Sequence, residues 1–176
     1  MADFRKALAH TLRWEGGYQA HPADPGNYNS IGELVGTNYG IAAPTLESWL
    51  GTHPSKRIMQ NLTIEAAGCI YRSGYWDSIK GDSIINQEVA NILFDGHVNH
   101  GRTGIRLMQD VLHVKRDAIV GPQTLNAINT APPHHIYPAY REARRAFYLR
   151  IVQRRPEMDV FLKGWLNRIN SFKYYP

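Results

Sequence analysis

Two carboxylates near the N-terminus have a spacing that suits acid–base chemistry. The stretch RWEGGYQAHPADPG, residues 13–26, places Glu15 directly before two glycines and Asp24 nine positions later. Two carboxyl groups that flank a sugar bond can hydrolyse it, one as general acid and the other as base, nucleophile or electrostatic partner. A loop that doubles back after a helix can bring such residues within roughly 6–10 Å of each other. Glu15 and Asp24 are therefore the first catalytic candidates.

Each candidate has an alternative interpretation. Asp24 lies in PADPG, a turn sequence in which aspartate commonly accepts a hydrogen bond from its own backbone. Glu15 could be an ordinary solvated residue at a helix end. Glu33 competes with Asp24 as the second carboxylate, and Thr37 could position a water molecule.

A helix is expected to position Glu15. Inward-facing positions recur at intervals of three and four residues, at Phe4, Leu8, Thr11, Leu12 and Glu15. This spacing predicts an amphipathic helix that begins after Asp3 and ends at Gly16 and Gly17. Glu15 would then lie on the apolar side of the last turn, where loss of water favours a carboxyl group that keeps its proton. A group of that kind can serve as a general acid.

The remaining chain predicts a mainly α fold with one small β-hairpin. Residues 21–40 are rich in Pro, Gly and Asn, which indicates a loop followed by a hairpin. Apolar periodicity, caps and breakers predict further helices over residues 45–50, 55–61, 63–72, 85–100, 103–113, 122–129, 136–154 and 159–169. Ile85 is expected on the buried face of the central helix. The arginines of residues 141–155 are expected mostly on a solvated face.

Composition limits the functional classes. The 176 residues, 43% hydrophobic and 20% charged, suit a globular chain with a core. The single Cys69 excludes an internal disulfide and is expected to be a buried small side chain. The first residues lack the features of a secretory signal and no segment suits a membrane span, so we expect synthesis in the cytoplasm and no membrane insertion. The net charge of +5 favours anionic polymers such as nucleic acid, an acidic wall or a membrane surface.

Other clusters are weaker candidates. His97 and His100, three residues apart with Asp95 nearby, could bind a metal, but no HExxH or Cys/His framework accompanies them. Such histidines are more often structural groups or cleft-lining donors, so we expect no metal. No recognition motif supports specific nucleic-acid binding.

Two groups of motifs resemble known families. EGGYQAHPADPG and TNYGIA resemble the glycoside hydrolase family 108 lysozymes, through Glu15, Gly16, Gly17, Tyr18, Pro22, Asp24, Gly26, Thr37, Gly40 and Ile41. YWDSIKGDSI, VANILFDGHVNHG, DAIVGPQTLNAIN and FLKGWLNRI resemble the peptidoglycan-binding-like region that accompanies them. The resemblance covers residues 4 to 170, and several separated motifs occur in the right order.

The resemblance implies a lysozyme-like helical fold and an N-acetylmuramidase with Glu15 as catalytic acid. It implies no metal and no organic cofactor. The β-1,4 bond between N-acetylmuramic acid and N-acetylglucosamine would be cleaved, with Asp24, or a water that it orients, at the anomeric centre. We expect a catalytic region over 1–85 and a peptidoglycan-binding-like region over 86–176, packed together. Sugar-contacting residues are expected to be Tyr18, Glu33, Tyr39, Trp76 and Asn99, although core packing is an equal alternative for Trp76.

One departure from the family pattern concerns the cleft. The usual G-G-x-T is replaced by GNYNSIGELVGT, an insertion between Gly26 and Thr37 that is expected to lengthen the hairpin at the lip of the cleft.

The family includes phage endolysins and secretion activators, so a holin or an export system would be the partner that gives access to the wall.

Three rival functions make different demands on these carboxylates. A lytic transglycosylase would use Glu15 without a second carboxylate. A non-catalytic wall-binding accessory protein would keep the fold and need no carboxylate. A nucleic-acid binder is suggested by the charge alone.

Overall fold

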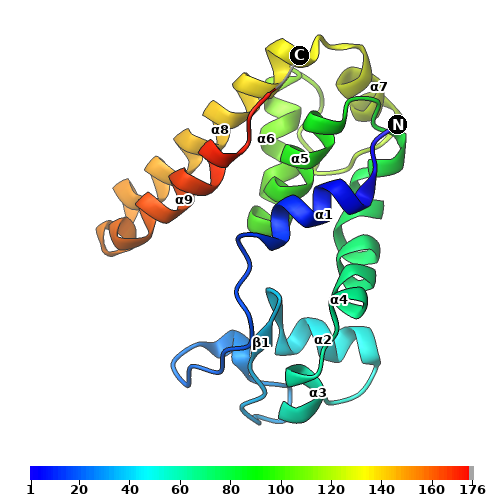
Figure 1. Ribbon diagram of the computed structural model, residues 1–176. Helices are drawn as coiled ribbons and strands as arrows, with labels where there is room; N and C mark the ends of the chain where they lie inside the picture. Colours follow the sequence, from blue (N-terminus) through cyan, green and yellow to red (C-terminus); the bar gives the residue numbers. More distant parts are fainter. Residues whose placement is uncertain (175–176) are drawn as a thin grey trace. The chain divides into compact units, whose positions relative to one another are not determined.

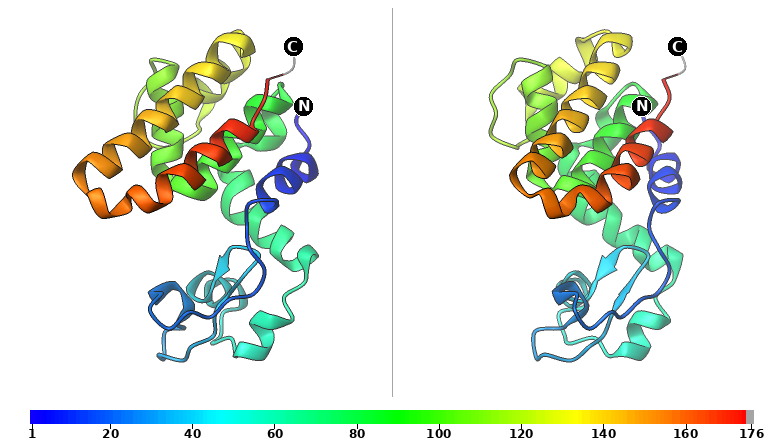
Figure 2. Two further views of the ribbon diagram at one scale, coloured as in Figure 1. Left: turned by 60° about the vertical axis from the view of Figure 1, so that its left-hand side comes forward. Right: turned by 90° about the vertical axis from the view of Figure 1, so that its left-hand side faces the viewer.

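The computed structural model describes residues 1–174, which are mainly helical (Figures 1 and 2). The helices are α1 (Phe4–Leu12), α2 (Ala43–Leu50), α3 (Lys56–Gln60), α4 (Ile64–Tyr71), α5 (Gln87–His100), α6 (Arg102–Val111), α7 (Pro122–Thr130), α8 (Pro133–Arg154) and α9 (Asp159–Ser171). Strand β1 (Thr37–Asn38) pairs antiparallel with β2 (Ile41–Ala42). The predicted mainly α, lysozyme-like fold with one small hairpin is confirmed. No helix within residues 1–174 combines the length and apolar character needed to cross a bilayer.

The chain forms two compact units. The first contains Met1–Ala7 and the described residues from Tyr75 onward, and the second contains Leu8–Gly74. The expected boundary near residue 85 therefore lies inside the first unit. An aromatic cluster explains why the N-terminus belongs there, because the Phe4 ring lies 5.6 Å from Trp76 and 5.9 Å from Phe94.

Side-chain caps mark the starts of α3, α4 and α5. The side chains of Ser55, Thr63 and Asn86 accept hydrogen bonds from the third residue of the helix that each precedes. These bonds satisfy backbone donors that have no partner within the helix. One predicted end is wrong, because α1 ends at Leu12 and not at Gly16. Helix α4 ends at Tyr71, within one residue of its predicted end, and the chain continues as the π-helical turn Arg72–Trp76.

The first unit is built around α5, which packs against α6 and α8. Gly104 permits the close approach of α5 and α6, since a Cβ there would lie 2.2 Å from the Gly96 carbonyl oxygen, and Gly96 leaves room for the Tyr140 side chain, whose hydroxyl oxygen would lie 2.1 Å from a Cβ on Gly96. The Tyr140 hydroxyl of α8 donates to the Gly104 carbonyl at 3.0 Å. The hairpin of α8 and α9 lies alongside (Figures 1 and 2). Ile85 precedes α5 and is 63% exposed, so its predicted burial is wrong.

A buried ion-pair cluster joins α5, α8 and α9. The carboxylate of Asp95 accepts from Arg144 Nη2 at 2.6 Å and from Arg168 Nη2 at 2.7 Å. Arg144 and Asp95 have no exposed side-chain surface. The expectation of a solvated face is therefore wrong for Arg144, because its charge is matched by a carboxylate 49 residues earlier.

Candidate active site

The β1–β2 hairpin of the second unit has a two-residue loop with a defined conformation. Its two-residue loop, Tyr39 and Gly40, has φ values of 49° and 73°. Two positive φ values are the geometry that a short hairpin loop requires, and glycine adopts it without strain. Tyr39 is held in place because the Tyr71 hydroxyl of α4 donates to its carbonyl oxygen at 2.9 Å.

Glu15 lies against this loop. A Cβ placed on Gly40 would be 2.5 Å from Glu15 Oε2 and 2.6 Å from the Tyr71 hydroxyl oxygen. The carboxylate and the hydroxyl therefore converge on the bare backbone of Gly40. Glu15 is partly buried, and the resemblance gave no role to Tyr71, whose only sequence signal is an apolar position on α4.

The turn that carries Glu15 differs from the predicted one. Helix α1 ends at Leu12, so Glu15 follows the helix instead of closing its last turn. The chain still coils tightly, because the N–H groups of Trp14 and Glu15 donate to the carbonyls of Thr11 and Leu12 at 3.0 and 3.2 Å.

Thr37 belongs to a hydrogen-bond network around Asn27. Its backbone pairs with that of Gln19 through two hydrogen bonds of 2.8 and 2.9 Å. Its hydroxyl donates to Asn27 Oδ1 at 2.7 Å, and Asn27 Nδ2 donates to Gln19 Oε1 and to the His21 carbonyl, both at 3.0 Å. Asn27 is fully buried. An asparagine in a turn-rich segment carries no distinguishing signal, so this role could not be predicted from the residue pattern.

Asp24 has the local role that its alternative interpretation described. Its side chain caps the 3₁₀ turn Pro25–Asn27 by accepting from the Gly26 N–H at 2.9 Å. Asp24 is exposed. Glu15 and Asp24 are therefore held by different parts of the second unit, one at the hairpin loop and one at the turn that leads to Asn27.

The insertion forms a loop of its own. Tyr28 and Leu34 form an isolated bridge, and Asn29 exchanges side-chain hydrogen bonds of 2.9 and 3.1 Å with Glu33. The strands of the hairpin remain two residues long. The expectation that the insertion lengthens the hairpin is therefore wrong, because its residues pair with each other. Glu33 is exposed and binds its own loop.

Helix α2 holds the insertion loop. Ser30 donates through its N–H to Glu47 Oε2 at 2.8 Å and through its hydroxyl to Glu47 Oε1 at 2.5 Å. His53 Nδ1 lies 2.5 Å from Glu47 Oε1. The hydrogen bonds from Ser30 hold the pKa of Glu47 below its usual value.

A hollow of about 490 Å³ lies between this loop and α2. It is lined by Pro25, Tyr28, Asn29, Ser30, Pro44, Glu47 and Ser48. A tyrosine face and proline rings, with amide, hydroxyl and carboxylate groups beside them, are the mixture of apolar and polar surface that suits a sugar ring.

The other predicted sugar contacts are scattered. Tyr18 is partly exposed and donates to the Val35 carbonyl at 3.1 Å. Trp76 is completely buried in the first unit and donates to Asp82 at 2.8 Å, so the prediction that it lines a cleft is wrong. Asn99 is exposed on α5 and donates to the Asp95 carbonyl at 2.7 Å.

The residues considered for a metal have other contacts. The two ring nitrogens of His97 lie 2.9 Å from the Gly101 carbonyl and 3.0 Å from the Ser78 hydroxyl. His100 packs against the Phe147 ring, and Asp95 forms the buried ion pairs described above. Within residues 1–174, no group of three or more His, Cys, Asp or Glu side chains is placed to hold a metal ion. Cys69 is exposed, contrary to its expected burial.

Comparisons with known proteins agree with the motifs. Residues 8–101 match the family model described as Glycosyl hydrolase 108, and residues 103–170 match the model described as Predicted Peptidoglycan domain. The solved structure of Brucella abortus SagA is 32% identical, covers 96% of this chain and 90% of that chain, and superposes with a TM-score of 0.78. No curated protein matches. The chain thus belongs to glycosyl hydrolase family 108, as a glycoside hydrolase of peptidoglycan with a peptidoglycan-binding-like C-terminal region.

Proposed function

We propose that this protein is an N-acetylmuramidase that cleaves the β-1,4 bond between N-acetylmuramic acid and N-acetylglucosamine, with Glu15 as the general acid. The observation that supports it most directly is the position of the Glu15 carboxylate, partly buried against the Tyr39–Gly40 loop and next to the Tyr71 hydroxyl. A carboxyl group held against rigid backbone can present its proton to a bound substrate with little reorganisation.

The mechanism follows from the two carboxylates. Glu15 gives its proton to the glycosidic oxygen as the bond to the anomeric carbon breaks. Water then bonds to that carbon, and the proton that it loses passes to Asp24, whose exposed carboxylate stabilises the positive charge during the step. Thr37 would hold the Pro25–Asn27 turn against β1 through its hydrogen bond to Asn27, and its hydroxyl could also orient the water.

The sugar chain would lie along the second unit. Tyr18 and Tyr39 offer partly exposed aromatic faces near the hairpin, and the hollow lined by Tyr28 and Pro44 offers a further surface. Glu33 could accept a hydrogen bond from a sugar hydroxyl. Asn99, in the first unit, stays a predicted contact.

The biological setting is part of this proposal. The protein would act on the wall as an endolysin or as a wall-remodelling factor in secretion, and would reach it through a holin or an export route. The net charge of +5 would hold it near an anionic wall, and salt would weaken this attraction.

The test is digestion of purified peptidoglycan, with the released fragments identified by mass spectrometry. Wild type should release fragments with a reducing muramic acid end, and Glu15→Gln should release at least 1000-fold fewer. Asp24→Asn should lose activity less severely. Glu65→Gln, at an exposed carboxylate in the first turn of α4, is the matched control and should behave as wild type. Full activity of Glu15→Gln would remove the proposal.

A lytic transglycosylase is the second candidate, because the Asp24 carboxylate is engaged in its own turn while Glu15 alone lies against the hairpin loop. In that reaction a hydroxyl of the substrate attacks the anomeric carbon. Products ending in an anhydro sugar, with Asp24→Asn as active as wild type, would identify it. An absence of fragments from any wall type would favour an accessory protein that only binds.

A further inference from the structure

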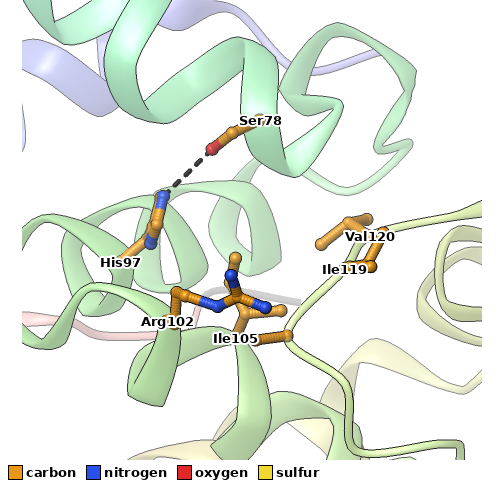
Figure 3. A pocket seen from close by; sticks show the side chains of 7 residues that line it. Ser78, His97, Arg102, Ile105, Ile119 and Val120 are labelled. Carbon is orange, nitrogen blue, oxygen red and sulfur yellow. Dashed lines mark hydrogen bonds between the residues drawn. The ribbon is translucent and has the colours of Figure 1, made fainter.

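The first unit contains a pocket of about 310 Å³ that the reaction at Glu15 does not use. It is lined by Ser78, His97, Arg102, Ile105, Ala118, Ile119 and Val120 (Figure 3). These residues come from the 3₁₀ turn Asp77–Ile79, the end of α5, the start of α6 and the segment that leads to α7. The volume is at the lower end of the range for ligand sites, roughly 300–1,000 Å³.

The polar side of the pocket favours an anion. Arg102 carries the one charged side chain among the seven lining residues, and its Nη2 donates to the Asp117 carbonyl at 3.1 Å. That bond holds the guanidinium at the rim and leaves it further N–H donors. His97 adds no charge near neutral pH, because burial lowers its pKa. No lining residue is acidic, so nothing in the pocket competes for the guanidinium.

The His97 ring has a defined orientation. The Gly101 carbonyl can only accept, so Nδ1 carries the ring proton and donates to it at 2.9 Å. Nε2 lies 3.0 Å from Ser78 Oγ, the contact drawn in Figure 3, and the Ser78 hydroxyl is itself fixed because it also lies 2.7 Å from the Tyr75 carbonyl, to which it donates. This side of the pocket is therefore rigid before any ligand binds.

The apolar side favours small aliphatic groups. Ile105, Ala118 and Val120 are buried walls, and Ile119 is 60% exposed at the opening. No Phe, Tyr or Trp side chain lines the pocket. Sugar rings are usually held by aromatic faces, which the hollow beside Tyr28 in the second unit offers and this pocket lacks. A short peptide with methyl side chains and a free carboxylate fits the lining better than a glycan does.

We propose that this pocket binds the carboxylate end of the peptides that peptidoglycan carries, with Arg102 as the anchor of the carboxylate and Ile105, Ile119 and Val120 in contact with alanine methyl groups. This proposal rests on the proposed function, because it takes peptidoglycan as the substrate. The pocket lies where the two family matches meet, since His97 falls in the first and Ile105 in the second. Peptide recognition would hold the wall to the protein while the glycan is cut.

The test is a binding titration with the intact protein. The probe is the synthetic peptide N-acetyl-L-Ala-γ-D-Glu-L-Lys-D-Ala-D-Ala, followed by NMR chemical-shift changes of the backbone amides. Shifts are expected at Arg102, Ile105 and Ile119. The same peptide with its C-terminal carboxylate amidated should bind at least 10-fold more weakly, because the guanidinium then loses its charged partner.

Two pocket variants and one surface variant distinguish binding in this pocket from nonspecific attraction to the positive charge of the protein. Arg102→Gln should weaken binding of the peptide at least 10-fold. Ile119→Asp should abolish binding, because it places a negative charge at the opening of the pocket. Ile119 is exposed, so that change leaves the core intact. Arg150→Gln, which removes an equal charge from an exposed position on α8, should bind as wild type. Equal affinity for the amidated peptide, or wild-type affinity in both pocket variants, would overturn the proposal, as would a peptide-free chitooligosaccharide that shifts the same amides more strongly.

The outcome is independent of the test of the reaction. Glu15→Gln should bind the peptide as wild type does, and Arg102→Gln should still cut glycan strands stripped of their peptides. Full hydrolysis by Glu15→Gln with normal peptide binding would overturn the proposed function alone, and hydrolysis that depends on Glu15 in a protein that binds no peptide would overturn the pocket proposal alone.

Discussion

The Glu15 carboxylate lies against the Cα of Gly40, with Oε2 only 2.5 Å from the place where a side chain would begin. The catalytic candidate is thus held by the backbone of a residue 25 positions later in the chain. The positive φ of 73° at Gly40 makes this approach possible, because the loop turns its bare Cα toward the carboxylate.

Gly40→Ala should therefore abolish activity. The new methyl group would displace both Glu15 and Tyr71, and an L-residue at this φ costs a further 1–2 kcal/mol or so. We expect kcat/KM on peptidoglycan to fall at least 100-fold. The control is Gly51→Ala, which has a φ of 69° and no atom within 4 Å of the added Cβ. It should show the same backbone cost in melting temperature with activity retained, and equal losses in both variants would contradict this account.

Tyr71→Phe should reduce activity with only a small effect on folding. The change removes the hydroxyl that donates to the Tyr39 carbonyl and lies beside Glu15. A lost hydrogen bond of this kind costs about 1 kcal/mol of unfolding free energy. Because the hydroxyl also lies beside Glu15, its loss should raise the activation barrier by about 1.4 kcal/mol, which lowers kcat roughly 10-fold. Unchanged kcat with lowered stability would show that Tyr71 supports the loop alone.

Thr37→Val should destabilise the second unit. Valine keeps the shape of threonine but leaves the buried Asn27 Oδ1 without one of its donors, at a cost of about 1–3 kcal/mol. Thr37→Ser keeps the hydroxyl and should stay close to wild type in urea denaturation. If Thr37→Val is fully stable but inactive, the hydroxyl acts on the water and not on Asn27.

His100 should make the first unit sensitive to acid. Burial, followed by the charge of Arg144, lowers its pKa to about 3, and its Nε2 has no hydrogen-bond partner within the described residues. The unfolded chain binds the proton below pH 6.5 while the folded chain does not, so stability falls as the pH drops from about 6.5 toward 3. The loss between pH 7 and pH 5 should be about 2 kcal/mol.

Urea denaturation of wild type and His100→Leu at these two pH values measures that loss. The variant should lose the part of the pH dependence that His100 contributes, while His97, whose pKa burial also lowers, keeps its own part. His134→Gln, at an exposed histidine, should keep the pH dependence of wild type. Asp95 affects folding stability at a lower pH than His100 does. Burial opposes its ionisation, but Arg144 and Arg168 hold its pKa below the usual value, so its contribution is present above about pH 4 and is lost at lower pH. A His100→Leu protein as acid-sensitive as wild type would assign the effect elsewhere.

Local features were predictable from residues a few positions apart. The caps at Ser55, Thr63 and Asn86, and the end of α5 at Gly101, depend on side chains within one helical turn. The hairpin followed from its turn residues, and the motif around Glu15 led to the family.

The errors share one physical cause. The end of α1 and the exposure of Ile85 and Cys69 depend on which distant segments cover them. Trp76 was open to either interpretation because an aromatic residue serves a core and a sugar site equally well, and its contacts with Phe4 and Phe94 decided for the core.

The amino-acid sequence alone determines the local structure of this protein, which comprises the helices, the hairpin and the motif with Glu15. Propensity, capping and turn geometry act over only a few residues. The partners of the polar groups were decided by the packed chain. Asn27 is buried beside Thr37, Asp95 between Arg144 and Arg168, and Arg102 stands at the rim of a pocket. Burial and pairing arise only when residues far apart in sequence meet, since the cost of removing a polar group from water depends on every atom around it.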